Sequence, residues 1–137
     1  MNYYTPITNY HQKAFYTCLR KTVQIAVDNN CDQILLVVPQ RGAMTGVIEE
    51  SLPKTTFNLL ISKKKAFLDP ITIFLQTRRA KHPGFVRGPV LGAYAYFDQL
   101  EEFIGSKNIP GIVLYSNASE DIAAFKKIAA TKELEII

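Results

Sequence analysis

The chain's 137 residues, mass of 15.4 kDa, 47% apolar residues and formal net charge of +4 are typical of one globular domain spanning residues 1–137. Its only cysteines, Cys18 and Cys31, have neither the short spacing nor the partner histidines of a metal site, and we expect no disulfide. The longest apolar run is far shorter than the roughly 18 residues that span a bilayer, so we expect a cytoplasmic protein without membrane insertion.

The first half of the chain is predicted to contain helices around one strand. Apolar residues repeat with a helical period over about residues 8–30, which predicts a long amphipathic helix. Residues 33–38 are aliphatic on both faces, as expected for a central parallel strand. Residues 42–52 are predicted to form a short helix that ends before Pro53, whereas the pattern of residues 56–62 fits either a strand or a helix.

The second half is predicted to alternate strands with helices. The predicted strands are 71–77, 90–94, 111–115 and 134–137, and the predicted helices are 97–104 and 119–130. Between the first two of these strands lies a polar loop, residues 78–89, with two prolines, two glycines and no helical pattern. Connections of this length without secondary structure are uncommon in compact domains and are often functional.

This alternation predicts the fold class. Strands that alternate with helices of sufficient length indicate right-handed crossovers and a largely parallel sheet. We therefore predict a three-layer α/β domain, Rossmann-like or flavodoxin-like, with about five strands and helices on both faces of the sheet. No motif is specific enough to indicate a family, and fold analogy alone assigns no function.

The basic residues are distributed unevenly. Seven of the sixteen lysines and arginines lie in the segment Lys63–Arg87, which contains one acid, Asp69, so that this segment carries +6 and the rest of the chain −2. An isolated basic segment is typical of a protein with a phosphate-bearing partner, but it also occurs as a solvated face. For the run Lys63–Lys65 we favour a solvated edge, because edge lysines oppose aggregation.

The candidate site follows from the predicted sheet. Ligands of open α/β sheets bind outside the carboxyl ends of the strands. The helix predicted near Gly42 has no acid in its first turn, unlike the later helices, so its N–H groups and dipole remain open to an anion. We expect backbone N–H groups around Gly42 and Ala43, guanidinium groups and the Thr45 hydroxyl to hold this anion. The predicted ligand-binding residues are Gln40, Arg41, Gly42, Thr45, Arg78, Arg79, Lys81, His82 and Asn117.

Simpler interpretations stay open for the same residues. Gly42 and Gly46 can be turn or packing glycines, because the Gly-Lys-Ser/Thr ending of a phosphate-binding loop is missing. The basic loop 78–89 is suited to grip phosphates and to stack on a base, but it can equally be tethered by surface salt bridges to Glu101 and Glu102.

Three functional hypotheses follow. The leading one is a non-catalytic cytosolic module that binds an anionic partner, a nucleotide-like small molecule or nucleic acid, without a cofactor or a metal. The first alternative is a small enzyme acting on a phosphorylated metabolite, with His82 or Asp69 transferring a proton. The second is a structural or oligomerising protein, such as a homodimer, without catalytic activity. Neither a nucleophile elbow nor a dinucleotide-binding glycine motif is present.

Overall fold

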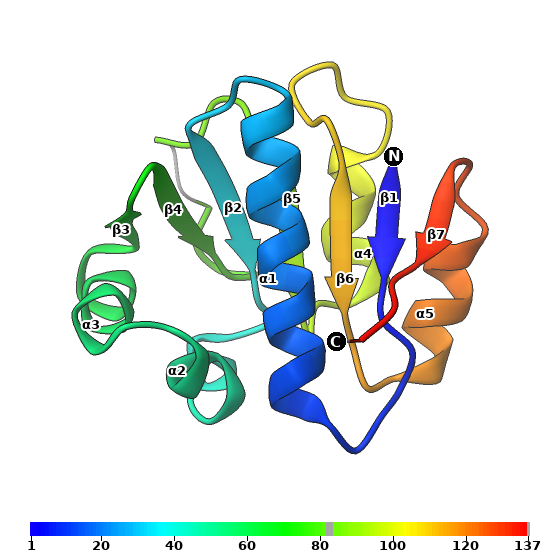
Figure 1. Cartoon of the computed structure of the whole chain (residues 1–137), viewed down its shortest axis with the longest axis horizontal. Helices are drawn as coiled ribbons and strands as arrows, with labels where there is room; N and C mark the ends of the chain where they lie inside the picture. The colour runs from blue at the N-terminus through cyan, green and yellow to red at the C-terminus, as the bar shows by residue number, and fades with distance from the viewer. Residues whose placement is uncertain (82–83, 137) are drawn as a thin grey trace.

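The computed structural model describes residues 1–81 and 84–136, and these contain a seven-stranded sheet (Figure 1). The strands are β1 (Asn2–Tyr4), β2 (Gln33–Val37), β3 (Lys65–Leu68), β4 (Ile71–Gln76), β5 (Val90–Ala93), β6 (Ile112–Tyr115) and β7 (Thr131–Glu133). Their order across the sheet is β3-β4-β2-β5-β6-β1-β7. The β3–β4 pair is antiparallel and the other pairs are parallel. The α/β class and the mostly parallel sheet agree with the prediction, whereas the expected number of about five strands is wrong.

The helices also differ in detail from the prediction. They are α1 (His11–Asp28), α2 (Val47–Ser51), α3 (Lys54–Lys63), α4 (Phe97–Leu100) and α5 (Ser119–Lys126), with two 3-10 segments, η1 (Arg41–Met44) and η2 (Glu101–Phe103). The long first helix is confirmed, and the ambiguous segment 56–62 lies in α3. The helix predicted over 42–52 is divided into η1 and α2, because Gly46 between them has a φ of 88°. None of the helices in the described ranges is long and apolar enough to cross a lipid bilayer.

The short strands β1, β3 and β7 are the ones that the sequence pattern does not reveal. β3 and β7 form the two edges of the sheet, and β7 is a polar strand of three residues. It precedes the strand predicted over residues 134–137, whose described part contains no strand. An edge strand is held by backbone hydrogen bonds to a single neighbour, so it needs no continuous apolar run and gives no strong periodic signal.

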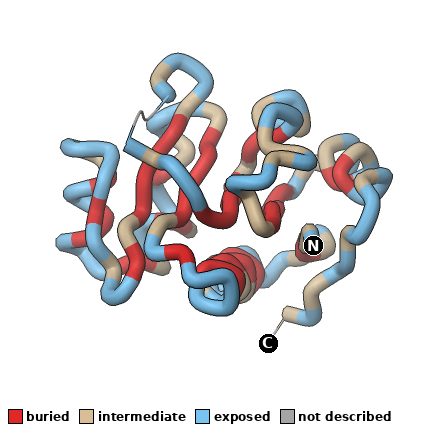
Figure 2. Tube along the Cα trace, turned by 90° about the horizontal axis from the view of Figure 1, so that it is seen from above, coloured by how far each residue is buried: buried red, intermediate tan, exposed pale blue. Residues whose placement is uncertain are grey.

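Two apolar clusters lie on opposite faces of the sheet. In β2, Ile34 and Leu36 belong to a cluster that also contains residues of α1, α2 and α3, whereas Leu35 and Val37 belong to a cluster with residues of α4 and α5. Successive side chains of a strand point to opposite faces, so an entirely apolar strand must be covered on both sides. In Figure 1, α1 passes in front of the strands and α4 lies behind them. Figure 2 shows buried residues along the strands and the inner side of α1.

The connection from β4 to β5 contains no helix among its described residues, in agreement with the predicted loop 78–89. Its later part is fixed to the sheet, because Gln33 Oε1 accepts a hydrogen bond from the Val86 N–H at 2.8 Å. The Phe85 ring contacts Phe74 edge-on, with 6.1 Å between the ring centroids, on the face that carries the α4 and α5 cluster. A loop therefore runs over this face beside β4, where a parallel crossover usually places a helix.

Candidate functional site

The strand order places a change of chain direction between two neighbouring strands, β2 and β5. From β2 the chain continues through α2 and α3 to β3 at one end of the sheet, whereas from β5 it continues through α4 to β6, toward the other end. Connections that leave neighbouring parallel strands in opposite directions open a crevice outside the carboxyl ends of these strands. We call the edge at which β4, β2, β5 and β6 end the carboxyl edge.

The strand register brings two of the predicted basic turns side by side at the carboxyl edge. Val37 in β2 pairs with Gln76 in β4, and the Val38 N–H donates to the Gln76 carbonyl at 3.0 Å. The turns that follow these two strands therefore leave the sheet next to each other. The predicted ligand-binding residues in these turns are Gln40, Arg41, Gly42 and Thr45 after β2, and Arg78, Arg79 and Lys81 after β4.

The two remaining predicted residues are not part of this pair of turns. Asn117 is exposed and follows β6, which is separated from β2 by β5, so it leaves the same edge two strands away. His82 lies outside the described residues. The structure thus brings together the residues predicted after β2 and β4, and it places Asn117 apart from them.

The turn after β2 uses some of the predicted ligand donors internally. The Ala43 N–H donates to the Gln40 carbonyl at 3.0 Å, and the Thr45 hydroxyl donates to the Gly42 carbonyl at 2.9 Å. A Cβ atom at Gly42 would meet no atom within 4 Å, so packing does not require this glycine. The group of this turn that faces solvent with a full charge is the exposed Arg41 side chain.

Two basic side chains of the loop are paired with acids in α4 and η2. Arg78 Nη2 lies 2.8 and 3.1 Å from the two carboxylate oxygens of Asp98, and the Arg78 guanidinium carbon lies 4.7 Å from the centroid of the Tyr96 ring. Lys81 Nζ lies 3.3 Å from a carboxylate oxygen of Glu102. These two residues therefore tether the loop by surface ion pairs. Both pairs are exposed, and such pairs contribute only about 0–1 kcal/mol each.

A small cavity of about 200 Å³ lies between the end of β4 and the start of α4. Its walls carry charges of both signs and consist of Gln76, Thr77, Arg78, Lys81, Asp98, Gln99 and Glu102. Gln99 fixes its shape, because its Nε2 donates to the Val38 carbonyl and its Oε1 accepts the Tyr96 N–H, both at 3.0 Å. Ligand pockets usually enclose about 300–1,000 Å³, so a ligand at this edge must lie mainly on the surface.

The antiparallel β3–β4 pair joins the two ends of the basic segment. The Leu75 N–H donates to the Lys64 carbonyl at 3.0 Å, and Lys65 pairs with Phe74, so the start of β3 lies beside the end of β4. The lysine run thus continues the line of basic turns along the carboxyl edge. Apart from Lys65, whose Nζ lies over the Phe74 ring, four exposed side chains on this line make no ion pair with any described acid. We call them the basic row: Arg41, Arg79, Lys64 and Lys63.

A tyrosine cluster that no sequence motif indicates occupies the ends of β5 and β6. Tyr115, only 2% exposed, places its Oη 3.2 Å from His11 Nδ1, and its ring centroid lies 5.1 Å from that of Tyr94. Burial and, to a lesser degree, the hydrogen bond with Tyr94 raise the pKa of Tyr115 above its usual value. Tyr94 has a φ of 58°, a left-handed conformation that costs a non-glycine residue some free energy. A protonated phenol offers no charge to an anion, so we interpret the cluster as support for these strand ends.

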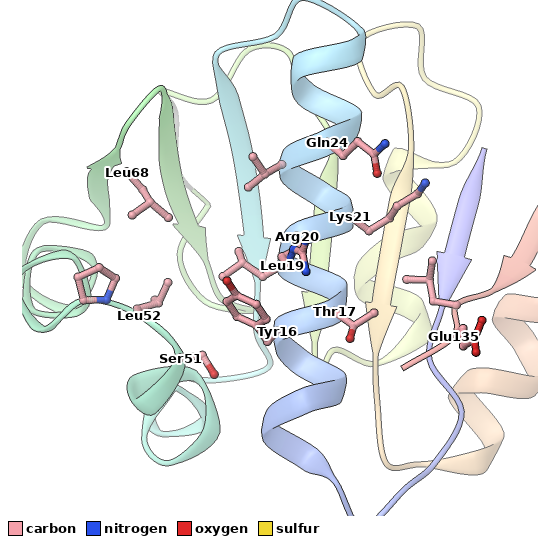
Figure 3. Close-up of a pocket in the computed structure, with 13 residues that line it drawn as sticks. Tyr16, Thr17, Leu19, Arg20, Lys21, Gln24, Ser51, Leu52, Leu68 and Glu135 are labelled. Carbon is pink, nitrogen blue, oxygen red and sulfur yellow. The ribbon is translucent and has the colours of Figure 1, made fainter. Parts of the chain in front are cut away.

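A wider cavity, of about 890 Å³, lies along the outer side of α1 (Figure 3). Figure 3 shows Tyr16 and Arg20 of α1 between Leu52 and Leu68 on one side and Glu135 on the other. None of the predicted ligand-binding residues lines this cavity. Its walls combine apolar groups with charges of both signs and do not specify an occupant.

The described residues contain no group of three or more histidine, cysteine, aspartate or glutamate side chains that could hold a metal ion. Comparison with protein-family models, with curated proteins and with solved structures finds no match. The function is therefore inferred from the chain's own residues and geometry.

Proposed function

We propose that the chain is a non-catalytic, cytosolic module that binds a phosphate-bearing partner along the carboxyl edge of β2 and β4. For the fold we propose a three-layer arrangement of Rossmann-like or flavodoxin-like type. The observation that supports the function most is the register between β2 and β4, which brings the Arg41 turn beside the Arg78–Arg79 turn. The change of chain direction between β2 and β5 favours the same edge.

The charges at this edge suit a phosphate. Guanidinium groups are planar and can bind two phosphate oxygens at once. Arg41 and Arg79 have no acidic partner among the described residues, so their charge is available to a ligand. Arg78 is held by Asp98, but the two side chains are 46% and 61% exposed, and such a pair is worth only about 0.2–1 kcal/mol. A doubly charged phosphate can therefore displace the Asp98 carboxylate.

Fluorescence anisotropy with a labelled mononucleotide and a labelled oligonucleotide, at low and moderate salt, tests this proposal. The double variant Arg41→Ala/Arg79→Ala removes two guanidinium groups, and we expect at least a roughly tenfold loss of affinity at low salt. The matched control is Lys127→Ala/Lys132→Ala, which removes two exposed charges near β7, at the other end of the sheet. At moderate salt the affinity of this control variant should stay within about twofold of the wild type, because the ions then screen charges at this distance.

Two results would contradict the proposal. One is the absence of measurable binding to either ligand, and the other is equal affinity of the wild type and the Arg41→Ala/Arg79→Ala variant. Binding that is insensitive to salt would also count against phosphate contacts, since each phosphate contact releases counterions and steepens the salt dependence.

The two alternative hypotheses have weaker support. Of the residues considered for proton transfer in an enzyme, Asp69 lies in the turn between β3 and β4, at the edge opposite the carboxyl edge, and His82 lies outside the described residues. The homodimer stays a prediction, and sedimentation velocity at micromolar concentration tests it.

A further inference from the structure

The face of the sheet that carries Phe74 is only partly covered where β3 and β4 lie. Phe67 pairs with Thr72 and Lys65 pairs with Phe74, so these four side chains share one face. Phe67 is 62% exposed although it lies inside a strand. In Figure 1, β3 and β4 lie at the end of the sheet away from α4 and α5, and the Phe85 ring of the following loop contacts Phe74 on this face.

Three lysines lie at one end of the strand that carries the exposed ring of Phe67. Lys63, Lys64 and Lys65 are all exposed at the start of β3, and Lys65 Nζ lies 5.8 Å from the centroid of the Phe74 ring. The one acid of the basic segment, Asp69, lies in the β3–β4 turn at the far edge of the sheet. The end of the open face next to the carboxyl edge therefore carries positive charge, and Asp69 lies at its other end.

A solvated edge that prevents aggregation does not account for both the lysine run and the exposed Phe67 ring. Lysines on an edge strand oppose edge-to-edge association, and this explains the run Lys63–Lys65. An exposed phenyl ring on the same strand has the opposite effect, because it offers apolar surface to a second molecule. The combination of a flat aromatic ring with flanking cations instead matches the surfaces on which unpaired nucleic-acid bases stack.

We propose that the partner at the carboxyl edge is a single-stranded nucleic acid, whose phosphates contact the basic row while one of its bases stacks on Phe67. This inference rests on the proposed function, because it uses the same edge. The basic row spans three neighbouring strands, about 4.8 Å apart, so its outer members are roughly 10 Å apart. A mononucleotide occupies only part of this row, whereas a strand of several nucleotides can follow all of it. A duplex buries the faces of its bases within its own stack, so it cannot use Phe67 in this way.

The test measures anisotropy of the full chain with a labelled oligothymidylate of about 12 nucleotides, a duplex of equal length and a labelled mononucleotide. We expect tighter binding of the single strand than of the duplex at equal salt. Phe67→Leu keeps an apolar side chain but removes the ring, and it should weaken single-strand binding about fivefold or more while leaving mononucleotide binding unchanged. Tyr16→Leu is the matched control, because Tyr16 is an aromatic residue, 51% exposed, on α1.

A second variant tests the phosphate contacts independently of the ring. Lys63→Gln/Lys64→Gln should lower the slope of log affinity against log salt by about 1–2 for the single strand. Lys127→Gln/Lys132→Gln should leave the slope unchanged. Circular dichroism spectra that match the wild type establish that the variants are folded, as expected for exposed positions.

The outcomes separate this inference from the function on which it rests. If Phe67→Leu binds the single strand as tightly as the wild type while Arg41→Ala/Arg79→Ala loses affinity, base stacking is refuted and the anion site stands. Equal competition by polyglutamate and oligothymidylate would likewise refute a nucleic-acid partner, because it indicates attraction by charge alone. If neither the oligonucleotide nor the mononucleotide binds, both proposals are refuted.

Discussion

The basic side chains of the carboxyl edge fall into two parts that meet different surroundings. Arg78 and Lys81, on the α4 side, are paired with acids that lie 20 and 21 residues further along the chain. The basic row, at the ends of β2 and β4 and the start of β3, makes no ion pair with a described acid. Both parts consist of exposed cations on the carboxyl edge, yet only the row offers charge without first breaking an ion pair.

This difference shows that the charge of a sequence segment is not the charge that a partner encounters. The segment carries +6 in the sequence, but acids from outside it neutralise two of its seven bases. Conversely, lysines and arginines more than ten positions apart become neighbours through the antiparallel β3–β4 pair. Four predictions test or sharpen this comparison, beginning with the largest effect.

Charge reversal should separate the two parts most clearly. Lys63→Glu/Arg79→Glu places two negative charges within the basic row, and we expect oligonucleotide affinity to fall about 100-fold at low salt. Lys81→Glu changes a cation that is already neutralised by Glu102, so its effect should stay below about tenfold. Anisotropy titrations measure both. Equal losses would show that the ion pairs do not distinguish the two parts.

A substitution that displaces the β4–β5 loop should lower stability more than the substitutions of charged residues do. A Cβ atom at Gly88 would collide with the backbone carbonyl of Gln33, so Gly88→Ala must shift the backbone. We expect the free energy of unfolding in urea to fall by about 2 kcal/mol. Gly42→Ala, where a Cβ meets no atom within 4 Å, should change it by less than about 0.5 kcal/mol. Equal stability of Gly88→Ala and the wild type would contradict this close packing.

Alkaline pH should distinguish the core from both basic parts. Burial raises the pKa of the Cys18 thiol from 9.0 to about 12, so the folded chain keeps a proton that the unfolded chain loses. Stability should therefore decrease as the pH rises above 9.0, by about 1 kcal/mol at one pH unit higher. Cys18→Ala should be less stable near neutral pH but should show a shallower decline. Cys18 belongs to the core cluster and to neither basic part, so Cys18→Ala should leave the oligonucleotide affinity of the folded chain unchanged near neutral pH.

Removing Asp98 should release the Arg78 guanidinium group from its ion pair. Asp98→Asn leaves Arg78 without its carboxylate partner, and we expect oligonucleotide affinity to rise about threefold with little change in stability. Glu120→Gln, which removes an exposed acid from α5, is the matched control and should have no effect. An unchanged affinity of Asp98→Asn would show that Arg78 does not face the ligand.

The central elements of the fold were predictable because their own residues determine them. α1 has a continuous apolar stripe, and β2 and β4 are aliphatic enough to be buried on both faces. The edge strands were not predictable, because backbone hydrogen bonds to a neighbouring strand, rather than an apolar pattern of their own, hold them in place. The glycines of segment 42–52 did not show where its helix is interrupted, since the conformation of Gly46 depends on where the chain turns.

The sequence predicted which residues follow the strands at the candidate site. It did not predict which of these side chains lie close together. The later helices were expected to carry acids in their first turns, and Asp98, in the first turn of α4, also binds Arg78 in the structure. Phe67 carried no sequence signal of its own, because exposure of a single ring depends on the absence of a helix over β3. These features are set by tertiary neighbours, and local pattern does not contain them.

The attachment of Gln33 has a consequence for how recognition can be lost. Its side chain holds the far end of the basic loop at the start of β2, about 17 Å from the carboxyl edge where the arginines lie. A mutation at this anchor removes the acceptor of the Val86 and Arg87 N–H groups without changing any basic side chain. Impaired recognition can therefore originate a full strand length from the place where the partner is bound.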